Sequence, residues 1–403
     1  MKYIVILADG MADRPLEELG GLTVLEKADK PTIDALAALG EVGLVKTVPD
    51  PLKPGSDVAN LSVMGYAPEK YYTGRSPLEA ISMGVPLKDD DIAIRCNLVT
   101  LSDEEPYEKK RMADYSAGEI TTEEAKELIS AVAEKLNDDL HSFHNGISYR
   151  HCLVRHSSRI GTDFTPPHDI SDKPIAEYLP KGLYGEEMLL LMKKSYDILA
   201  KHPVNVKRRE RGLNPATSIW LWGEGTKPSL PSFYDKYHLK GEVISAVDLI
   251  KGLGISAEMR VPDIEGATGN LHTNFKGKAK AAIDAFKDGY DYVYLHMEAP
   301  DECGHQGDTA GKIRSIEIID SVVVRYIKSE LDRLSIPYRM LIMPDHPTPI
   351  SIKTHSREAV PYLIYDSTKD ISNGAVTYSE REAANTKKYY ADAPSLIEHF
   401  LEK

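Results

Sequence analysis

The amino-acid sequence predicts an α/β protein in which a mainly parallel sheet is flanked by helices and a second α/β domain is inserted into the first. Apolar runs at 2–10, 291–301 and 338–346 each end abruptly in acidic or histidine residues. Such runs are typical of strands that are buried on both faces of a parallel sheet. The segment 311–331 between the last two runs has the spacing of a long amphipathic helix. Strands that alternate with helices indicate a parallel sheet covered on both faces.

The elements near the N-terminus follow the same alternation. Residues 2–10, KYIVILADG, predict a buried strand because the run is continuous and contains β-branched residues. Residues 32–40, TIDALAALG, predict a helix that a glycine ends. Residues 53–66, KPGSDVANLSVMGY, predict a tight turn and then a helix that begins at Ser56 or Asp57. Ser56 is therefore either a helix cap or a nucleophile held at a helix N-terminus.

The middle of the chain carries its own set of elements, which predicts the inserted domain. Strands are expected at 91–101, 148–157 and 218–225, and a helix with acidic residues in its first turn is expected at 121–137. We place the inserted domain at 88–235. The first domain is then discontinuous, formed by 1–87 and 236–403.

The composition narrows the class of protein. The chain has 403 residues, of which 42% are hydrophobic and 28% charged, so a large core and a globular fold are expected. The net charge of −13 disfavours a nucleic-acid partner, which would select a basic face. Three widely spaced cysteines suit a reducing compartment. The N-terminal apolar run is too short for a signal peptide and no segment is long enough to span a membrane, so a cytoplasmic location is expected.

Side chains that bind metals gather after the strands of the expected sheet, where parallel sheets bind their ligands. Six candidates fall in expected loops, four of them directly after strands: Asp9, Asp301, His305, Asp345, His346 and His355. Three ligands per ion leave open positions, as a catalytic site with two divalent metal ions requires. Mixed oxygen and nitrogen ligands favour Mn²⁺ or Zn²⁺, with Mg²⁺ as an alternative.

Each motif also has a plainer interpretation. The D-x-x-x-H spacing of Asp301 and His305 also suits a polar loop, and the adjacent pair Asp345 and His346 also suits an ordinary strand end. The conjunction of six ligands with Ser56 favours chemistry, because a metal-activated serine hydroxyl can attack phosphorus. The N–H groups of a helix N-terminus would bind the phosphate oxygens.

These segments together resemble the alkaline phosphatase superfamily, and within it the archaeal-type cofactor-independent (2,3-bisphosphoglycerate-independent) phosphoglycerate mutases. The matching segments are ILADGMADRP, KPGSDVANLSVMGY, YYTGRSPLEA, EAPDECGHQGD, MPDHPTP and THSREAVP, in the family's order from residue 4 to 361. The resemblance implies an alkaline-phosphatase-like fold and interconversion of 3-phosphoglycerate and 2-phosphoglycerate in glycolysis and gluconeogenesis. The phosphoryl group would pass through a phosphoserine at Ser56, without 2,3-bisphosphoglycerate.

The resemblance also implies a role for each candidate residue. One metal would take Asp9, Ser56, Asp345 and His346, and the other would take Asp301, His305 and His355. The inserted domain would bind the non-phosphate part of the substrate, and domain closure would exclude water from the phosphoserine. Candidate substrate contacts there, for which surface ion pairs are the alternative, are Arg95, Asn97, Arg111, Asp114, Arg150 and His151.

Three other functions stay open at this point. The segments VILADGMADRP and NPATSIWLWGEG equally resemble a branch of the family proposed to act as a homoserine kinase in threonine biosynthesis. Simple hydrolysis, as in a phosphatase or sulfatase, is a further alternative. A metal-binding regulatory protein is the last alternative, although binding alone requires no serine beside the ions.

Overall fold

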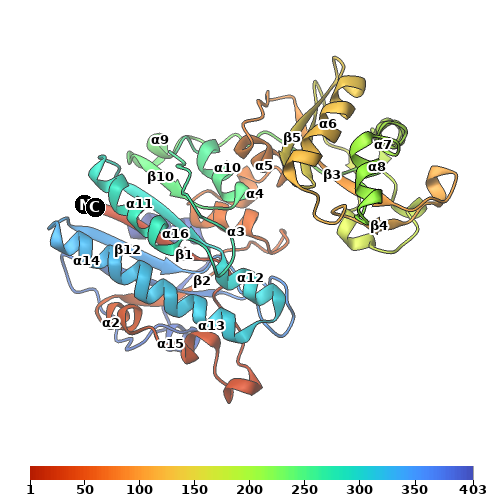
Figure 1. Ribbon diagram of the computed structural model, residues 1–403. Helices are drawn as coiled ribbons and strands as arrows, with labels where there is room; N and C mark the ends of the chain where they lie inside the picture. The colour runs from red at the N-terminus through yellow and green to blue at the C-terminus, as the bar shows by residue number, and fades with distance from the viewer. Residues whose placement is uncertain (403) are drawn as a thin grey trace. The chain divides into compact units, whose positions relative to one another are not determined.

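The middle of the chain folds as a unit of its own in the computed structural model, which describes residues 1–402 (Figure 1). The first unit comprises Met1–Tyr72 and Ser229–Lys403, and the second comprises Thr73–Pro228. The sequence analysis placed the inserted domain at 88–235, whereas the second unit begins at Thr73 and ends at Pro228. Helix α5 (Ser76–Ser82) belongs to the second unit because its Ala80 packs with residues of that unit's sheet.

A seven-stranded sheet forms the centre of the first unit. Its order is β10 (Gly241–Ile244), β11 (Tyr292–Met297), β1 (Lys2–Ala8), β12 (Tyr338–Met343), β13 (Val360–Asp366), β2 (Glu41–Val45) and β14 (Tyr389–Tyr390). The first four strands run parallel, whereas β13 is antiparallel to both of its neighbours. The mainly parallel α/β fold and its three predicted strands are therefore confirmed, while the antiparallel β13 was not predicted.

Helices cover both faces of this sheet. One face packs on α2 (Pro31–Leu39), α11 (Phe275–Lys287), α13 (Thr309–Ile318) and α14 (Arg325–Arg333), which share one hydrophobic core with Ile4, Ile6 and Ala8 of β1. Helix α3 (Ser56–Val63) packs against both α10 (Asp248–Ser256) and α16 (Ala393–Leu401), and Phe400 of α16 contacts Tyr3, an odd-numbered residue of β1 that faces the other way. Its shorter helices are α1 (Val24–Lys27), α4 (Pro68–Tyr71), α9 (Phe233–Tyr237), α12 (Ala299–Gln306), α15 (Glu380–Asn385) and the 3₁₀ turn Glu17–Leu19.

The helix expected at 311–331 is interrupted by a π-helical turn, Ile319–Val324, between α13 and α14. The turn lets Asp320 reach α2, where its carboxylate accepts a 2.6 Å hydrogen bond from the backbone N–H of Ile33. A carboxylate stabilises a helix N-terminus because it complements the macrodipole and the free N–H groups there. This long-range contact explains the departure from a regular helix.

The second unit is built on a five-stranded sheet. Its order is β4 (Met112–Asp114), β3 (Ile92–Leu101), β6 (Arg150–Arg155) and β5 (His141–Ile147), with β9 (Ser218–Thr226) also paired to β3. Helices α6 (Thr122–Leu136), α7 (Gly185–Leu199) and α8 (Pro203–Glu210) contribute to a core shared with β3 and β9. The remaining elements are β7 (Thr162–Asp163), β8 (Lys181–Gly182) and 3₁₀ turns at Tyr107–Lys109, Pro167–Ile170 and Ala176–Tyr178.

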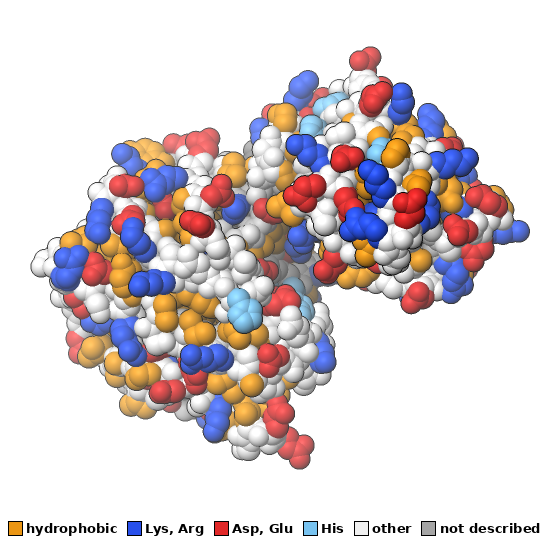
Figure 2. Space-filling model, in the orientation of Figure 1, with side chains coloured by type: hydrophobic (Ala, Val, Ile, Leu, Met, Phe, Trp, Pro, Cys, Tyr) orange, Lys and Arg blue, Asp and Glu red, His pale blue; other side chains and the backbone are white. Residues whose placement is uncertain are grey.

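The surface is mixed in charge. On the face shown in Figure 2, acidic and basic side chains are interspersed over each unit. Within residues 1–402, no helix combines the length and the apolar composition that a membrane span requires.

Candidate metal centre

The ends of three neighbouring parallel strands bring the expected metal ligands to one edge of the sheet. Asp9 follows β1, Asp345 and His346 follow β12, and Asp301 lies in the helix after β11. Ligand atoms of Asp9, Asp345 and His346 all lie within 4.8 Å of one another. Those of Asp301, His346 and His355 also lie within 4.8 Å of one another, so two groups of ligands meet at His346.

The first group is buried and rich in negative charge. His346 Nε2 lies 3.3 Å from Asp345 Oδ2 and 3.7 Å from Asp9 Oδ1. Burial and the nearby carboxylates of Asp345 and Asp301 raise the pKa of Asp9 well above its usual range. Burial lowers the pKa of His346, which favours the neutral imidazole that metals bind. Among the described residues, Asp9 Oδ1 is buried without a hydrogen-bond partner.

Asp301 of the second group lies on α12 (Ala299–Gln306), which also carries His305 beside the group. Asp301 and His305 stand one helical turn apart, with 3.2 Å between Asp301 Oδ2 and His305 Nε2. His355 Nε2 lies 3.5 Å from Asp301 Oδ1 and 3.0 Å from His305 Nε2. The expectation that Asp301 and His305 lie in a loop is therefore wrong. The helix continues through Gly304, and Gly307 ends it in the left-handed conformation with φ of +74°.

Hydrogen bonds set the charges in this second group. The hydrogen bond to Asp301 raises the pKa of His305 to about 9. Burial opposes ionisation of Asp301, but hydrogen bonds from His305 and His355 outweigh it and hold the pKa of this carboxyl well below its usual range. The ion pair between His305 and Asp301 balances one of the negative charges of the site.

The two groups are packed against each other at Gly10. This residue has φ of +62°, and a Cβ atom built on it would lie 2.6 Å from Asp301 Oδ1 and 2.7 Å from Asp301 Cα. Only glycine allows this conformation without strain and this approach of α12 to the end of β1. Gly10 therefore lets Asp9 and Asp301 face the same space.

Ser56 is the first residue of α3, and its hydroxyl points to the ligands. The N-cap is Gly55, which makes no side-chain cap, while Asp57 Oδ1 accepts a 2.9 Å hydrogen bond from the Val58 N–H. Ser56 Oγ lies 3.1 Å from His346 Nε2. Ser56 therefore does not cap α3, and its hydroxyl faces His346.

Buried polar side chains that the sequence analysis missed hold this arrangement. Asn60, one turn after Ser56, donates to the Ser56 carbonyl at 2.8 Å and to Asp345 Oδ2 at 2.7 Å, and accepts from the Tyr294 hydroxyl at 2.6 Å. His296 Nε2 lies 2.8 Å from Asp9 Oδ2. The signals in the sequence were an asparagine four residues after Ser56 and a histidine within the apolar strand YVYLHM.

The chemistry of these side chains fits divalent cations. Three carboxylates converge with three imidazoles and a serine hydroxyl, and one buried carboxylate oxygen has no protein partner. Such an excess of buried acceptors is costly unless cations neutralise it. Each of the two ligand groups, Asp9 with Asp345 and His346 and Asp301 with His346 and His355, offers the mixed oxygen and nitrogen donors that a divalent cation accepts.

The second unit brings together only part of the expected substrate contacts. The guanidinium of Arg95 lies 4.0 Å from the ring centre of Trp222 and pairs with Glu79 at 2.8 Å. Asn97, two residues along the same strand, accepts a 2.9 Å hydrogen bond from the Trp222 indole N–H. Arg150 is exposed beside the Tyr149 ring.

The other three candidates do not join this cluster. Burial lowers the pKa of His151 to about 3, and its Nδ1 accepts a hydrogen bond from the Gly146 N–H. Asp114 organises its own turn by accepting from Ser116 and Gly118 N–H groups. The exposed Arg111 donates to the carbonyl of Asp172.

Comparison with known proteins identifies similar chains. Residues 37–205 match a family model described as 2,3-bisphosphoglycerate-independent phosphoglycerate mutase. A protein of that name from Methanosarcina barkeri is 49% identical over 98% of each chain. A protein from Geobacter sulfurreducens, named as a probable enzyme of the same kind, is 46% identical over the full length of both.

Two solved structures share the fold. A Pyrococcus horikoshii protein is 29% identical and has a TM-score of 0.82, and the match covers 100% of this chain and 98% of that chain. A cofactor-independent phosphoglycerate mutase from Thermoplasma acidophilum is 24% identical and has a TM-score of 0.68, with 100% of this chain and 99% of that chain covered. The second likeness supports the fold alone.

Proposed function

The chain belongs to the 2,3-bisphosphoglycerate-independent phosphoglycerate mutase family, and we propose how its own residues carry out the reaction that this membership implies. The enzyme interconverts 3-phosphoglycerate and 2-phosphoglycerate by phosphoryl transfer, without 2,3-bisphosphoglycerate. The observation that carries the mechanism is the Ser56 hydroxyl, which points from a helix N-terminus toward two groups of metal ligands.

Two divalent ions complete the site in this proposal. Asp9, Ser56, Asp345 and His346 hold one, and Asp301, His305 and His355 hold the other. Mn²⁺ or Zn²⁺ suits these mixed oxygen and nitrogen donors. When bound, the ions lower the pKa of the serine hydroxyl and neutralise charge on the phosphoryl oxygens.

Ser56 carries the phosphoryl group between the two hydroxyls of glycerate. Its Oγ forms a bond to phosphorus while the bond from phosphorus to the 3-oxygen breaks, and the 3-oxygen gains the proton that Ser56 loses. The 2-hydroxyl then attacks the phosphoserine, loses its proton and releases Ser56, which is protonated again. The free N–H groups at the start of α3 stabilise the phosphoryl oxygens.

We assign binding of the glycerate part to the second unit. Arg95, Asn97 and the exposed Arg150 supply cationic and amide donors, which suit a carboxylate. Replacing Arg150 by methionine should raise KM for 3-phosphoglycerate about 10-fold, the effect of losing one charged hydrogen bond. An unchanged KM would remove Arg150 from this role.

The decisive experiment uses the Ser56→Ala variant. Formation of 2-phosphoglycerate is followed with enolase as the coupling enzyme, and metal content is measured on the same samples. We expect a loss of at least about 10⁴-fold in kcat with most of the metal retained, because removing a nucleophile abolishes the covalent route. Turnover at the wild-type rate would refute the phosphoserine.

Matched measurements on the wild-type enzyme address the alternatives. Inorganic phosphate formed faster than 2-phosphoglycerate would indicate a phosphatase. Incubation with ATP and homoserine should yield no O-phosphohomoserine in ³¹P NMR spectra of the Zn²⁺-loaded protein. Growth of that signal without 2-phosphoglycerate would indicate the kinase instead.

A further inference from the structure

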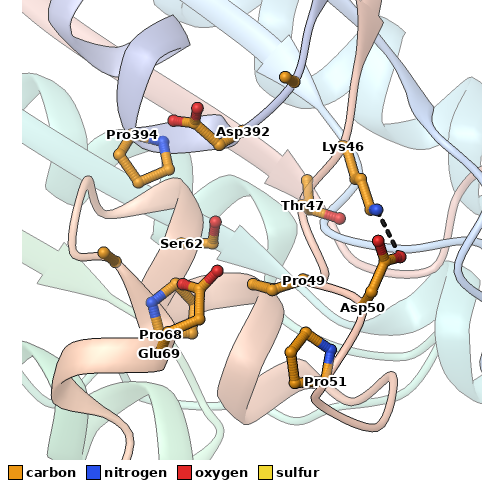
Figure 3. Close-up of a pocket in the computed structure, with 12 residues that line it drawn as sticks. Lys46, Thr47, Pro49, Asp50, Pro51, Ser62, Pro68, Glu69, Asp392 and Pro394 are labelled. Atoms are coloured by element: carbon orange, nitrogen blue, oxygen red, sulfur yellow. Dashed lines mark hydrogen bonds and ion pairs between the residues drawn. The ribbon is translucent and has the colours of Figure 1, made fainter.

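A cavity of about 500 Å³ lies in the first unit beside the helix that begins with Ser56 (Figure 3). It is lined by residues that follow β2, by residues that follow β14, and by parts of α3, α4 and the start of α16. Strands β2 and β14 run parallel to each other, so their carboxyl ends open on this one cavity. Its volume is in the range of sites that bind small molecules.

Two hydroxyls in the cavity wall have no protein partner. Ser62 and Thr47 are each only 2% exposed, and among residues 1–402 neither side chain makes a hydrogen bond. Figure 3 shows the Ser62 hydroxyl directed into the cavity, with Glu69 and Asp392 on either side of it. A hydroxyl that faces a cavity and has no protein partner is free to bond to a ligand, so this wall is suited to a polar group.

The charges around the cavity select a cation. Of the four charged residues that line it, Lys46 is already paired with Asp50 at 2.5 Å. Within the described chain, Glu69 and Asp392 are paired with no cation. Asp392 also caps α16, because its Oδ1 accepts a hydrogen bond from the Ser395 N–H.

The rest of the lining selects an organic body. Pro49, Pro51, Pro68 and Pro394 line the cavity with rigid apolar rings. A metal ion would leave most of this space unfilled and would meet no dense set of ligands. A primary ammonium group has three N–H donors, which match one hydroxyl and two carboxylates.

We propose that this cavity binds a small organic molecule with a primary ammonium group on an apolar body. Ser62, Glu69 and Asp392 bind the ammonium group, and the proline rings contact the apolar part. The site is separate from the metal ligands, although Ser62 shares α3 with Ser56.

Two connections link the cavity to catalysis, and this part of the inference rests on the proposed function. Ser62 lies six residues after Ser56 on one continuous helix, so a ligand that shifts α3 moves the nucleophile. Arg357 donates to the carbonyls of Asp50 and Leu52 at 3.1 Å each, and it follows the ligand His355 by two residues. Occupancy of the cavity therefore changes the geometry at the metal site.

Binding is tested by isothermal titration of the metal-loaded protein with pentylamine, 1-pentanol and pentanoate, which share a body and differ in charge. We expect pentylamine to bind at least 10-fold more tightly than either control. The double variant Glu69→Gln and Asp392→Asn should weaken pentylamine at least 10-fold, because it removes both charges while asparagine retains the helix cap. Glu398→Gln alters an exposed side chain of α16, the helix that Asp392 caps, and should leave the binding of pentylamine unchanged.

Equal binding of pentylamine and 1-pentanol, or unchanged binding to the double variant, would overturn the proposed site. Coupling is tested in the enolase-linked assay, where saturating pentylamine should change kcat at least 2-fold for the wild type and not for the double variant. An unchanged kcat with binding intact would overturn the coupling alone. The binding of pentylamine is also measured with the Ser56→Ala variant. The test of the cavity therefore does not depend on whether the phosphoserine mechanism is correct.

Discussion

Breaking the ion pair between Lys312 and Asp13 tests how the first unit holds the loops that carry the candidate metal ligands. Both side chains are 0% exposed, and Lys312 Nζ lies 2.7 Å from Asp13 Oδ2. The same ammonium donates to the carbonyls of Ala12 at 3.2 Å and Thr348 at 2.8 Å. Helix α13 thereby ties the loop after β1 to the loop after β12.

The structure sets the size of the effect. Lys312→Met keeps the apolar stem and leaves Asp13 as an uncompensated buried charge, a change that costs about 3–5 kcal/mol. Asp13 retains a 2.8 Å hydrogen bond from the Arg14 N–H, so we expect a cost near the lower end, about 3 kcal/mol. In Lys312→Met with Asp13→Asn, neither charge remains, and the combined cost should fall below the sum of the single costs by about 1–3 kcal/mol.

The assay exploits the placement of the tryptophans. Both of the chain's tryptophans, Trp220 and Trp222, lie in the second unit, so their fluorescence reports on that unit. In urea at pH 7, Lys312→Met should lower the midpoint seen by far-UV circular dichroism by about 1 M and leave the fluorescence midpoint unchanged. A cost below about 1 kcal/mol, or additive single costs, would refute the reasoning.

Three further predictions follow from other buried groups. Asn60→Leu should destabilise the first unit by about 3 kcal/mol and weaken metal binding, since it leaves the Tyr294 hydroxyl and the Asp345 carboxylate without their hydrogen bonds to Asn60. Urea unfolding followed by circular dichroism measures the stability, and metal titration measures the binding. A loss of stability under about 1 kcal/mol would contradict the prediction. Burial, with a smaller contribution from the nearby Asp288 carboxylate, raises the pKa of Glu242 to about 7 despite Arg260 beside it. Between about pH 4.5 and 7 the folded state therefore holds a proton that the unfolded state has released, so the free energy of unfolding should fall by about 2 kcal/mol as the pH rises through this window. Glu242→Gln should flatten this dependence on pH, measured by urea unfolding at several pH values. An identical pH dependence in the variant would exclude Glu242 as the cause. Chelation should lower stability, because 1 mM of a metal bound with Kd of about 10 µM contributes about 2.7 kcal/mol; an unchanged melting temperature after addition of EDTA would count against the site.

Local patterns predicted the elements that surround the site. The strands β1, β11 and β12 were predicted because a parallel strand buried on both faces is a continuous apolar run. The candidate ligands were found because polar residues follow such strands at one edge of the sheet. The roles given to these residues, and to those of the second unit, stay proposals that the experiments above test.

Other features depend on contacts between residues distant in sequence. The pairing of Asn60 with Asp345 joins residues 285 positions apart, and no local periodicity indicates it. The antiparallel direction of β13 is also set by its neighbours, since an apolar run has the same composition in either direction. The cavity beside α3 joins two strand ends with three helices, so no single segment indicates it.

The sequence by itself determined the fold class, the family and the kinds of side chain available for phosphoryl transfer, because these depend on residue types and their order. The tertiary structure decided that Ser56 Oγ faces His346, that Asp301 and His305 share a helix, and that Ser62 opens on a separate cavity. The physical reason is that the direction of a side chain is set by the packing of its element against the others. Hydrogen-bond distances and burial then decide which polar groups keep their charge.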